Sequence, residues 1–191
     1  MRLVWLMFPA FVACGPPPTP AVPVLGTTRV VFETTTGTFE VGLYDSQTPV
    51  TVENFIQYVE EGFYDGRDGL GGTVFHRAVN GFVVQGGGFV ATGEQKITRP
   101  PIVNEASMSR LSNVRGTLSM ARTNVPDSAT SQFFVNLADN LPLDAGGQSP
   151  DGFAVFGEVV EGMAVIDAMG AAPVIGETPI DPVEVLRAEV Q

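Results

Sequence analysis

The residue types that carry most enzymatic chemistry are scarce in this sequence. It contains one histidine, His76, and one cysteine, Cys14. A hydrolase triad would have to combine His76 with an arbitrary Ser and Asp, and such combinations arise by chance in most sequences. No cluster of His, Cys and carboxylate residues has the spacing of metal ligands, so we expect no metal and no cofactor. Acid–base, nucleophilic and metal-assisted mechanisms are therefore poorly supported.

Three consecutive glycines, Gly86–Gly88, follow an apolar stretch at Phe82–Gln85, which is where a phosphate-binding loop would lie. The glycine spacing of such loops, their Lys-Ser/Thr ending and the helix that follows them are all missing. Nucleotide binding is therefore not supported.

The acidic balance of the chain argues against nucleic-acid partners. The sequence has 10 Lys and Arg against 21 Asp and Glu, a formal net charge of -11; without Arg2 the balance is 9 against 21, or -12. Binding a phosphate backbone or an anionic membrane surface requires a basic face, and no Lys/Arg cluster exists.

Residues 1–13 have the layout of a short export signal. Arg2 precedes an apolar run, Leu3–Val12, which ends at the small residue Ala13. The run is about half of the ~20 residues that a membrane-spanning helix needs. An N-terminal core strand is the alternative, but Pro9 within the run and the prolines from Pro16 to Pro20 argue against it.

The stretch from Phe11 to Gly15 resembles a bacterial lipobox, although Phe11 replaces the usual Leu. The resemblance implies cleavage before Cys14 and acylation of its thiol and new amino group, whereas an incidental cysteine is the alternative. Several acyl chains would anchor the protein firmly, with residues 14–27 as a lipidated, Pro-rich tether. We expect a location in the cell envelope at the periplasmic face, and Gly15 in place of Asp favours the outer membrane.

Residues 28–191 are expected to form one β-rich domain, because 22 Gly and 15 Pro indicate many turns. Alternating apolar residues on either side of Thr35–Gly37 predict a hairpin. Further short strands are expected at residues 73–75, 82–85, 116–120, 132–136, 154–158 and 183–190. Thr48 as N-cap, Pro49 at the first position and Gly62 as the stop predict a helix, and residues 162–169 predict a second one. Many strands with two helices suggest a closed β-barrel with helical caps.

Four ordered segments carry a family resemblance. They are GTVFHRAVNGFVVQGGGF at residues 72–89, RGTLSMART at 115–123, DSATSQFFVN at 127–136 and FAVFGEV at 153–159. The chain from about Arg29 to Val190 resembles cyclophilins, a family of peptidyl-prolyl cis-trans isomerases, and its Met-Ala-Arg-Thr is closest to the bacterial periplasmic branch. The resemblance implies a mainly β fold, a closed eight-stranded antiparallel barrel capped by two α-helices, and a monomer.

The reaction that this resemblance implies explains why acids and bases are missing. An X-Pro amide resists rotation by ~18–20 kcal/mol, and nothing has to be protonated or cleaved when it rotates. By resemblance Arg77 is the catalytic residue, whose guanidinium donates to the prolyl nitrogen as that nitrogen loses its amide resonance. Without the resemblance, Arg77 would be interpreted as an ordinary surface ion-pair residue.

The substrate-binding residues also come from the resemblance. The proline pocket maps onto Phe82, Val83, Phe134 and Leu143; the peptide groove onto Ala121 and Arg122; substrate and Arg77 are held by Gln85 and Gln132. Strand alternation independently places Gln132, Phe134 and Asn136 on one face and Phe133 and Val135 on the other. Spacing alone would favour Phe82, Val83 and Phe134 as barrel core. His76 is expected to be structural, because adjacent strand residues point to opposite faces.

Two departures from the family pattern bear on ligand preference. Pro142 stands where cyclosporin-sensitive members have Trp and many bacterial members have Phe. Phe153 replaces the usual pocket His or Tyr, and residues 145–152 before it form a glycine-rich loop. We therefore expect weak cyclosporin binding. Two functions remain open: an isomerase that acts on proline-containing exported polypeptides and assists their folding, and a membrane-tethered proline-peptide-binding chaperone with little turnover.

Overall fold

The computed structural model describes residues 19–191, so the predicted signal over residues 1–13 and the lipidation of Cys14 lie outside the described residues. The strands are β1 (Arg29–Thr34), β2 (Gly37–Leu43), β3 (Asp65–Gly66), β4 (Gly71–Phe75), β5 (Arg77–Val79), β6 (Val83–Gly86), β7 (Phe89–Val90), β8 (Thr117–Met120), β9 (Phe133–Asn136), β10 (Val155–Glu161), β11 (Val174–Ile175), β12 (Thr178–Pro179) and β13 (Val183–Val190). The helices are α1 (Pro49–Glu60), α2 (Ala106–Ser109), α3 (Met163–Gly170) and a 3₁₀ turn, η1 (Leu141–Leu143). All the strands expected from the sequence are present.

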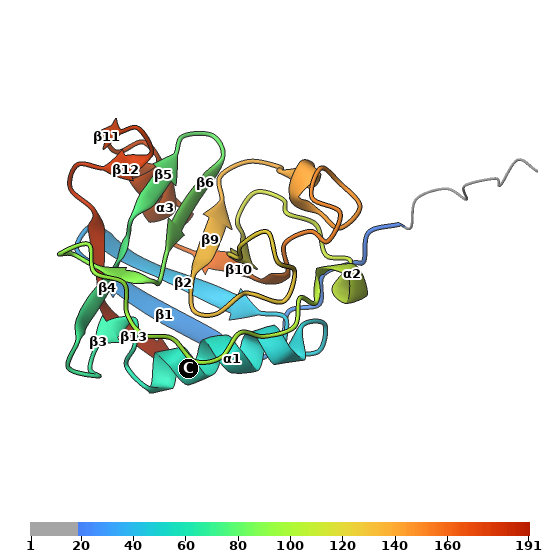
Figure 1. Cartoon of the computed structure of the whole chain (residues 1–191), viewed down its shortest axis with the longest axis horizontal. Coiled ribbons are helices and arrows are strands. Elements are labelled where there is room, and N and C mark those ends of the chain that lie inside the picture. The colour runs from blue at the N-terminus through green and yellow to red at the C-terminus, as the bar shows by residue number, and fades with distance from the viewer. Residues whose placement is uncertain (1–18) are drawn as a thin grey trace, which may run out of the picture.

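One curled antiparallel sheet of 11 strands dominates the fold (Figure 1). Its strand order is β3-β4-β13-β1-β2-β10-β8-β9-β6-β5, and β7 adds to β4. The predicted hairpin is β1 with β2, in which Phe32 lies opposite Phe39. The strands β9, β6 and β5, which carry Phe134, Gln85 and Arg77 of the candidate site, follow one another at one end of this order.

The prediction of a closed eight-stranded barrel with two helices is wrong: the sheet is an open, curled half-barrel, and the described chain has three α-helices. Near one end of the sheet, β4 continues through His76 directly into β5 at the other end, but β4 and β5 do not pair. β4 and β6 also do not pair; they are in contact through the side chain of Phe75. The ring of Phe75 lies so close to Gly86 that a Cβ there would be 2.8 Å from it.

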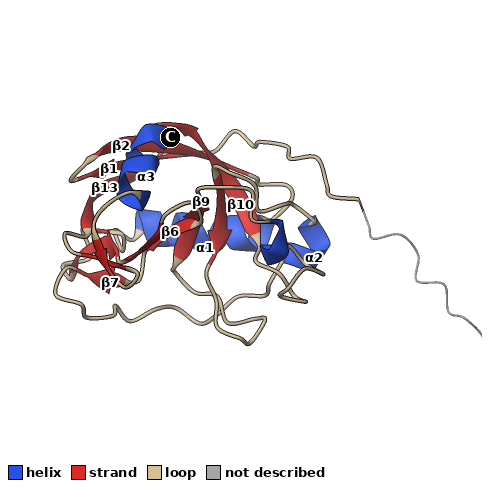
Figure 2. Cartoon of the chain, turned by 90° about the horizontal axis from the view of Figure 1, so that it is seen from above, coloured by secondary structure: helices blue, strands red, loops and turns tan. Residues whose placement is uncertain are grey.

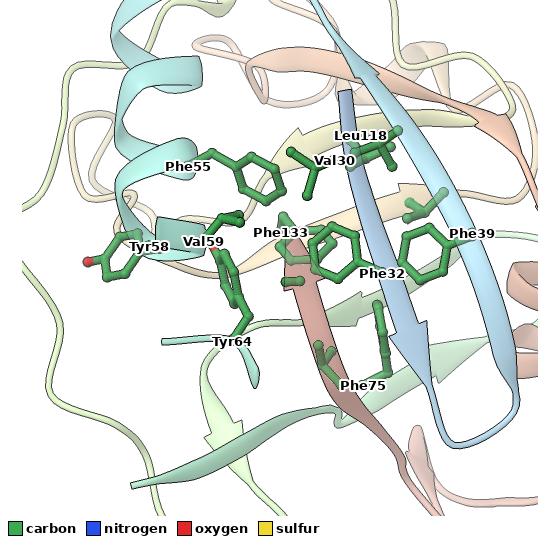
Figure 3. Close-up of a cluster of buried hydrophobic side chains, with 14 of the residues drawn as sticks. Val30, Phe32, Phe39, Phe55, Tyr58, Val59, Tyr64, Phe75, Leu118 and Phe133 are labelled. Atoms are coloured by element: carbon green, nitrogen blue, oxygen red, sulfur yellow. The ribbon is translucent and has the colours of Figure 1, made fainter. Parts of the chain in front are cut away.

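Aromatic side chains fill the space inside the curled sheet (Figure 3). Phe32 and Phe39 stack with their centroids 5.0 Å apart, and Phe55 of α1 meets Phe133 edge-on at 5.5 Å. Helix α1 packs against β13, whereas α3 packs against β2, β5 and β6, and a view from above separates the two helices (Figure 2). This core fixes β6 and β9 and therefore the side chains on their opposite faces.

The start of α1 is capped from a distant segment. The helix begins at Pro49 after Thr48, as predicted, but the Thr48 side chain makes no capping hydrogen bond. The buried carboxylate of Glu105 instead accepts hydrogen bonds from the backbone N–H groups of Val50 at 3.3 Å and Thr51 at 2.8 Å, and from the Thr51 hydroxyl at 2.7 Å. A carboxylate at a helix N-terminus satisfies unpaired donors and complements the helix dipole.

The described part of the predicted tether contacts the domain. The N–H of Ala21 donates to the carbonyl of Arg110 at 2.9 Å. Nε2 of Gln47 donates a hydrogen bond to the carbonyl of Val22 at 3.0 Å, and Oε1 of Gln47 accepts one from the N–H of Val24 at 2.7 Å. From residue 21 onward this segment therefore lies along the domain surface. Among the helices of residues 19–191, none is both long and apolar enough to cross a bilayer.

Candidate functional site

A cavity of about 200 Å³ gathers the predicted site residues at the β5–β6–β9 end of the sheet. It is lined by Arg77, Phe82, Val83, Gln85, Ala121, Arg122, Phe134, Leu143 and Phe153. These include every catalytic and substrate-binding residue expected from the sequence except Gln132. That residue lines an adjoining groove together with Gln85, Ala121 and Arg122.

The strand register places the polar and apolar parts of the cavity in one row. Arg77 on β5 is the direct partner of Gln85 on β6, and Gln85 is the partner of Phe134 on β9. Because directly opposed residues project from the same face of a sheet, all three side chains lie on one side. The residues next in sequence, such as Val84 and Val135, point into the aromatic core.

Phe134 and Val83 are buried but are not part of the core inside the sheet. Phe134 is 4 % exposed and Val83 is 2 % exposed. Both line the cavity, while the neighbouring Phe133 and Val135 belong to the core. The interpretation of these side chains as barrel core is therefore wrong, and the predicted division of β9 into two faces is confirmed.

The guanidinium of Arg77 is held from two sides. Its Nε donates to the Glu177 carboxylate at 2.6 Å, and its Nη1 donates to Oε1 of Gln85 at 3.4 Å. Nε2 of Gln85 then donates to Oε1 of Gln132 at 3.0 Å, which links Gln132 to the site. The Arg77 guanidinium holds the pKa of the Glu177 carboxyl below its usual value, because it donates that hydrogen bond and carries the opposite charge.

Arg122 forms one wall of the cavity and secures the loop beside it. Its Nε donates to the carbonyl of Gly152 at 2.9 Å, and its Nη2 donates to the Ser149 hydroxyl at 2.7 Å. Its guanidinium carbon lies 4.6 Å from the centroid of the Phe153 ring, a cation–π geometry. The Phe153 ring also meets Phe134 edge-on at 5.6 Å. The glycine-rich loop over residues 145–152 is thus tied to the cavity wall.

A network of buried and half-buried polar side chains holds the segment that carries Leu143. The Asp144 carboxylate accepts hydrogen bonds from the backbone N–H of Asn113 at 2.7 Å and from its side chain at 2.9 Å. Asn140 donates to Oδ1 of Asn136 at 2.8 Å and to the carbonyl of Phe82 at 2.9 Å. These bonds fix both ends of η1, where Leu143 lines the cavity and the neighbouring Pro142 does not.

His76 lies away from this cavity. Its ring meets Phe89 edge-on at 4.7 Å and borders a separate cavity of about 290 Å³ with Val74 and Val90. Burial lowers its pKa below the ordinary value of 6.5. This placement agrees with a structural histidine that points to the opposite face from Arg77.

Glu177, Asn113 and the Glu105 cap were not found from the sequence. Glu177 is 100 residues from Arg77 and Asp144 is 31 residues from Asn113, so no local spacing connects either pair. Within residues 19–191, no three His, Cys, Asp or Glu side chains gather as metal ligands.

Comparisons with known proteins point to one family. A family model described as cyclophilin type peptidyl-prolyl cis-trans isomerase matches residues 29–190. The chain is 52 % identical over 148 residues to peptidyl-prolyl cis-trans isomerase A of Dickeya dadantii, a match that covers 78 % of this chain and 74 % of that protein. It is 49 % identical over 140 residues to peptidyl-prolyl cis-trans isomerase B of Escherichia coli, covering 72 % and 81 % of the two chains.

A solved structure has the same fold. The crystal structure of a Cryptosporidium parvum cyclophilin type peptidyl-prolyl cis-trans isomerase, determined in the presence of the dipeptide Ala-Pro, superimposes with a TM-score of 0.69 at 24 % identity. The match covers 85 % of this chain and 98 % of that chain.

Proposed function

Since this chain belongs to the cyclophilin family and is a peptidyl-prolyl cis-trans isomerase, we propose that Arg77 lowers the rotational barrier by donating hydrogen bonds to the twisted amide of its substrate. The observation that carries this proposal is the position of the Arg77 guanidinium on the wall of the cavity that Phe134 also lines. The positive charge of Arg77 therefore lies next to the apolar part of the same cavity.

The barrier sets how much stabilisation the site has to supply. Uncatalysed isomerisation takes roughly 10–100 s at 25 °C. A rate gain of ~10⁵ requires only about 7 kcal/mol of preference for the transition state. No bond is broken and no proton is transferred, so hydrogen bonding and shape alone are sufficient for this amount.

Arg77 supplies a preference for the twisted amide. In the planar amide the prolyl nitrogen shares its lone pair with the carbonyl, so it is a poor acceptor. As the bond rotates, the nitrogen becomes pyramidal and its lone pair accepts a hydrogen bond. A guanidinium remains charged and planar at any physiological pH, so one N–H can meet the nitrogen while another holds a substrate carbonyl. An interaction that is stronger in the transition state than in the ground state accelerates the reaction.

The apolar part of the cavity binds the proline ring. Phe82, Val83, Phe134 and Leu143 surround the space next to Arg77. Transfer of the pyrrolidine ring from water to this slot gains roughly 25 cal/mol per Å² of buried apolar surface. This gain is similar for the planar and the twisted amide, so we assign it to substrate binding and not to catalysis.

A protease-coupled assay on a short X-Pro-Phe peptide tests the mechanism. We expect Arg77→Ala to lower kcat/KM by about 10²-fold or more, because the lost donor acts mainly in the transition state. Arg115→Ala is the matched control, since Arg115 also pairs with a carboxylate, Asp167, but does not line the cavity. Full activity of Arg77→Ala would exclude the mechanism.

We further propose that the protein works in the cell envelope, where it assists the folding of proline-containing exported proteins. The support is the sequence of residues 1–14, with Cys14 as the acylated residue and the periplasmic face of the outer membrane as the favoured location. Metabolic labelling with a fatty-acid analogue tests the anchor. Wild type should be labelled and Cys14→Ser should not; equal labelling would contradict the proposal.

The alternative is a membrane-tethered proline-peptide-binding chaperone with little turnover. It is motivated by Pro142 and by Phe153, whose ring lies in the cavity wall against Arg122 and Phe134. The retained Arg77 and Gln85 favour turnover, and the wild-type rate in the same assay separates the two functions. We also propose that the protein is a monomer and that Pro142 weakens cyclosporin binding, which size-exclusion and titration measurements test.

A further inference from the structure

A short hairpin after α3 brings an acidic residue to Arg77. Its strands are β11 and β12, with Val174 opposite Pro179. Gly176, at φ +66°, and Glu177 form the two-residue turn between them. A glycine with positive φ at the first central position is typical of a tight hairpin turn. The turn places the Glu177 carboxylate at the tip of the hairpin, against β5.

The backbone of Glu177 is fixed as well as its side chain. Its carbonyl accepts a hydrogen bond from the N–H of Ala78 at 2.8 Å, beside Arg77 on β5. At the base of the hairpin, the N–H of Ile180 donates to the carbonyl of Pro173 at 2.9 Å. The carboxylate therefore reaches Arg77 from an anchored backbone, so only the side-chain torsions of Glu177 have to be ordered.

The Arg77 guanidinium uses some of its N–H groups in hydrogen bonds within the protein and leaves others available. Glu177 takes Nε at 2.6 Å, and Gln85 accepts weakly from Nη1 at 3.4 Å. Within the described part of the chain, no acceptor makes a hydrogen bond with Nη2. The donors of an arginine fork are rigidly arranged, so fixing Nε and Nη1 also fixes the direction of Nη2.

We propose that Glu177 is a positioning residue for Arg77, which holds Nε so that the remaining N–H groups face the substrate amide. This inference rests on the proposed catalytic function of Arg77. The competing interpretation is an ordinary surface ion pair, because the side chains of Arg77 and Glu177 are 32 % and 57 % exposed. Exposed pairs contribute little to stability, so the two interpretations differ in their effect on turnover and not on folding.

The experiment compares Glu177→Ala, Glu177→Gln and wild type in the protease-coupled assay, with kcat and KM measured separately. We expect Glu177→Ala to lower kcat by about 10-fold with KM changed by less than about twofold, because misplacing a transition-state donor by about an ångström has costs of this order or larger. Glu177→Gln keeps an acceptor oxygen for Nε, so we expect it to recover at least about half of the lost activity.

Asp167→Ala is the matched control, because Asp167 forms an exposed pair with Arg115 and does not line the cavity. It should leave kcat unchanged. The Nε–H resonance of Arg77 gives an independent readout: we expect it to shift and to exchange faster with water in Glu177→Ala but not in Asp167→Ala.

Combining Glu177→Ala with Arg77→Ala separates the two proposals. If Glu177 acts through Arg77, the double variant should be no slower than Arg77→Ala alone. Unchanged kcat in Glu177→Ala while Arg77→Ala is inactive would overturn the role of Glu177 and leave the mechanism intact. An additional loss in the double variant would also overturn it. Full activity of Arg77→Ala would instead reject the catalytic function of Arg77 itself.

Discussion

Arg77 and Gln85 are directly opposed on β5 and β6, and Gln85 is directly opposed to Phe134 on β9. The donor, the side chain that contacts it and the apolar wall are thus arranged by strand register. A shift of one residue in β5 would turn Arg77 into the core and Ala78 into the cavity. The geometry of the site is therefore as precise as the pairing of these three strands.

Gln85→Ala removes the side-chain oxygen that accepts from Nη1 of Arg77 and the amide that reaches Gln132. We expect kcat/KM to fall by about fivefold, corresponding to one hydrogen bond of about 1 kcal/mol. The protease-coupled assay measures this change. Gln57→Ala, on α1, removes an equivalent side chain outside the cavity and should leave kcat/KM unchanged. An equal loss in both variants would contradict the prediction.

Phe134→Leu shortens the apolar wall without leaving a large cavity. We expect KM to rise by about 10-fold with a smaller change in kcat, because the ring contributes mainly to binding of the proline side chain. Substrate titration in the same assay measures both parameters. Phe133→Leu alters the core on the opposite face of β9, so it should lower the unfolding temperature with little effect on KM. The reverse pattern would show that the two faces have been assigned incorrectly.

Glu105→Gln tests the distant cap of α1. The substitution replaces a charged carboxylate, whose oxygens accept hydrogen bonds from the N–H groups of Val50 and Thr51, with a neutral amide. We expect the free energy of unfolding to fall by about 1–2 kcal/mol. Chemical denaturation measures the change, and kcat/KM of the folded protein should be retained. Thr48→Val removes the hydroxyl at the N-cap position and should cost less than Glu105→Gln. A larger cost for Thr48→Val would mean that the local residue is the cap.

Much of the local structure was predictable because its signals are local. Alternation at Phe39, Val41 and Leu43 predicts a strand wherever that strand pairs, and Thr48-Pro49 marks a helix start in most surroundings. The curled but open sheet was not predictable in the same way. Whether its ends pair depends on the bend at His76 and on the fit of Phe75 against Gly86, which no periodicity encodes.

The residues of the site also differ in how far they could be predicted from the sequence. Residues in short segments that resemble the family, such as Arg77, Gln85 and Phe134, were predicted from that resemblance, and they line one cavity. Glu177 contacts Arg77 and Glu105 contacts Thr51, both far away in the sequence. In the sequence alone, neither carboxylate differs from an ordinary surface residue. Long-range partners of charged groups are therefore the part of the site that required a structure.

The partial burial of His76 predicts a specific dependence of stability on pH. Desolvation lowers its folded-state pKa below 6.5, so the unfolded chain binds a proton that the folded chain resists. Its contribution is therefore complete above about pH 6.5 and is lost as the pH falls through that value toward the folded-state pKa. We expect wild type to lose stability between pH 7 and 5.5 in denaturation measurements, and His76→Gln to lose less over this interval. Parallel curves for the two proteins would contradict the prediction.

The last strand of the chain, β13, lies between β4 and β1 in the order of the sheet. Without Val183–Val190, the strands of this sheet fall into two groups that share no ladder, so the polypeptide cannot complete the sheet before β13 is in place. The two groups of strands become one sheet only when β13 pairs with both β4 and β1. The enzymatic competence of the domain therefore depends on β13, although this strand carries none of the residues that line the cavity.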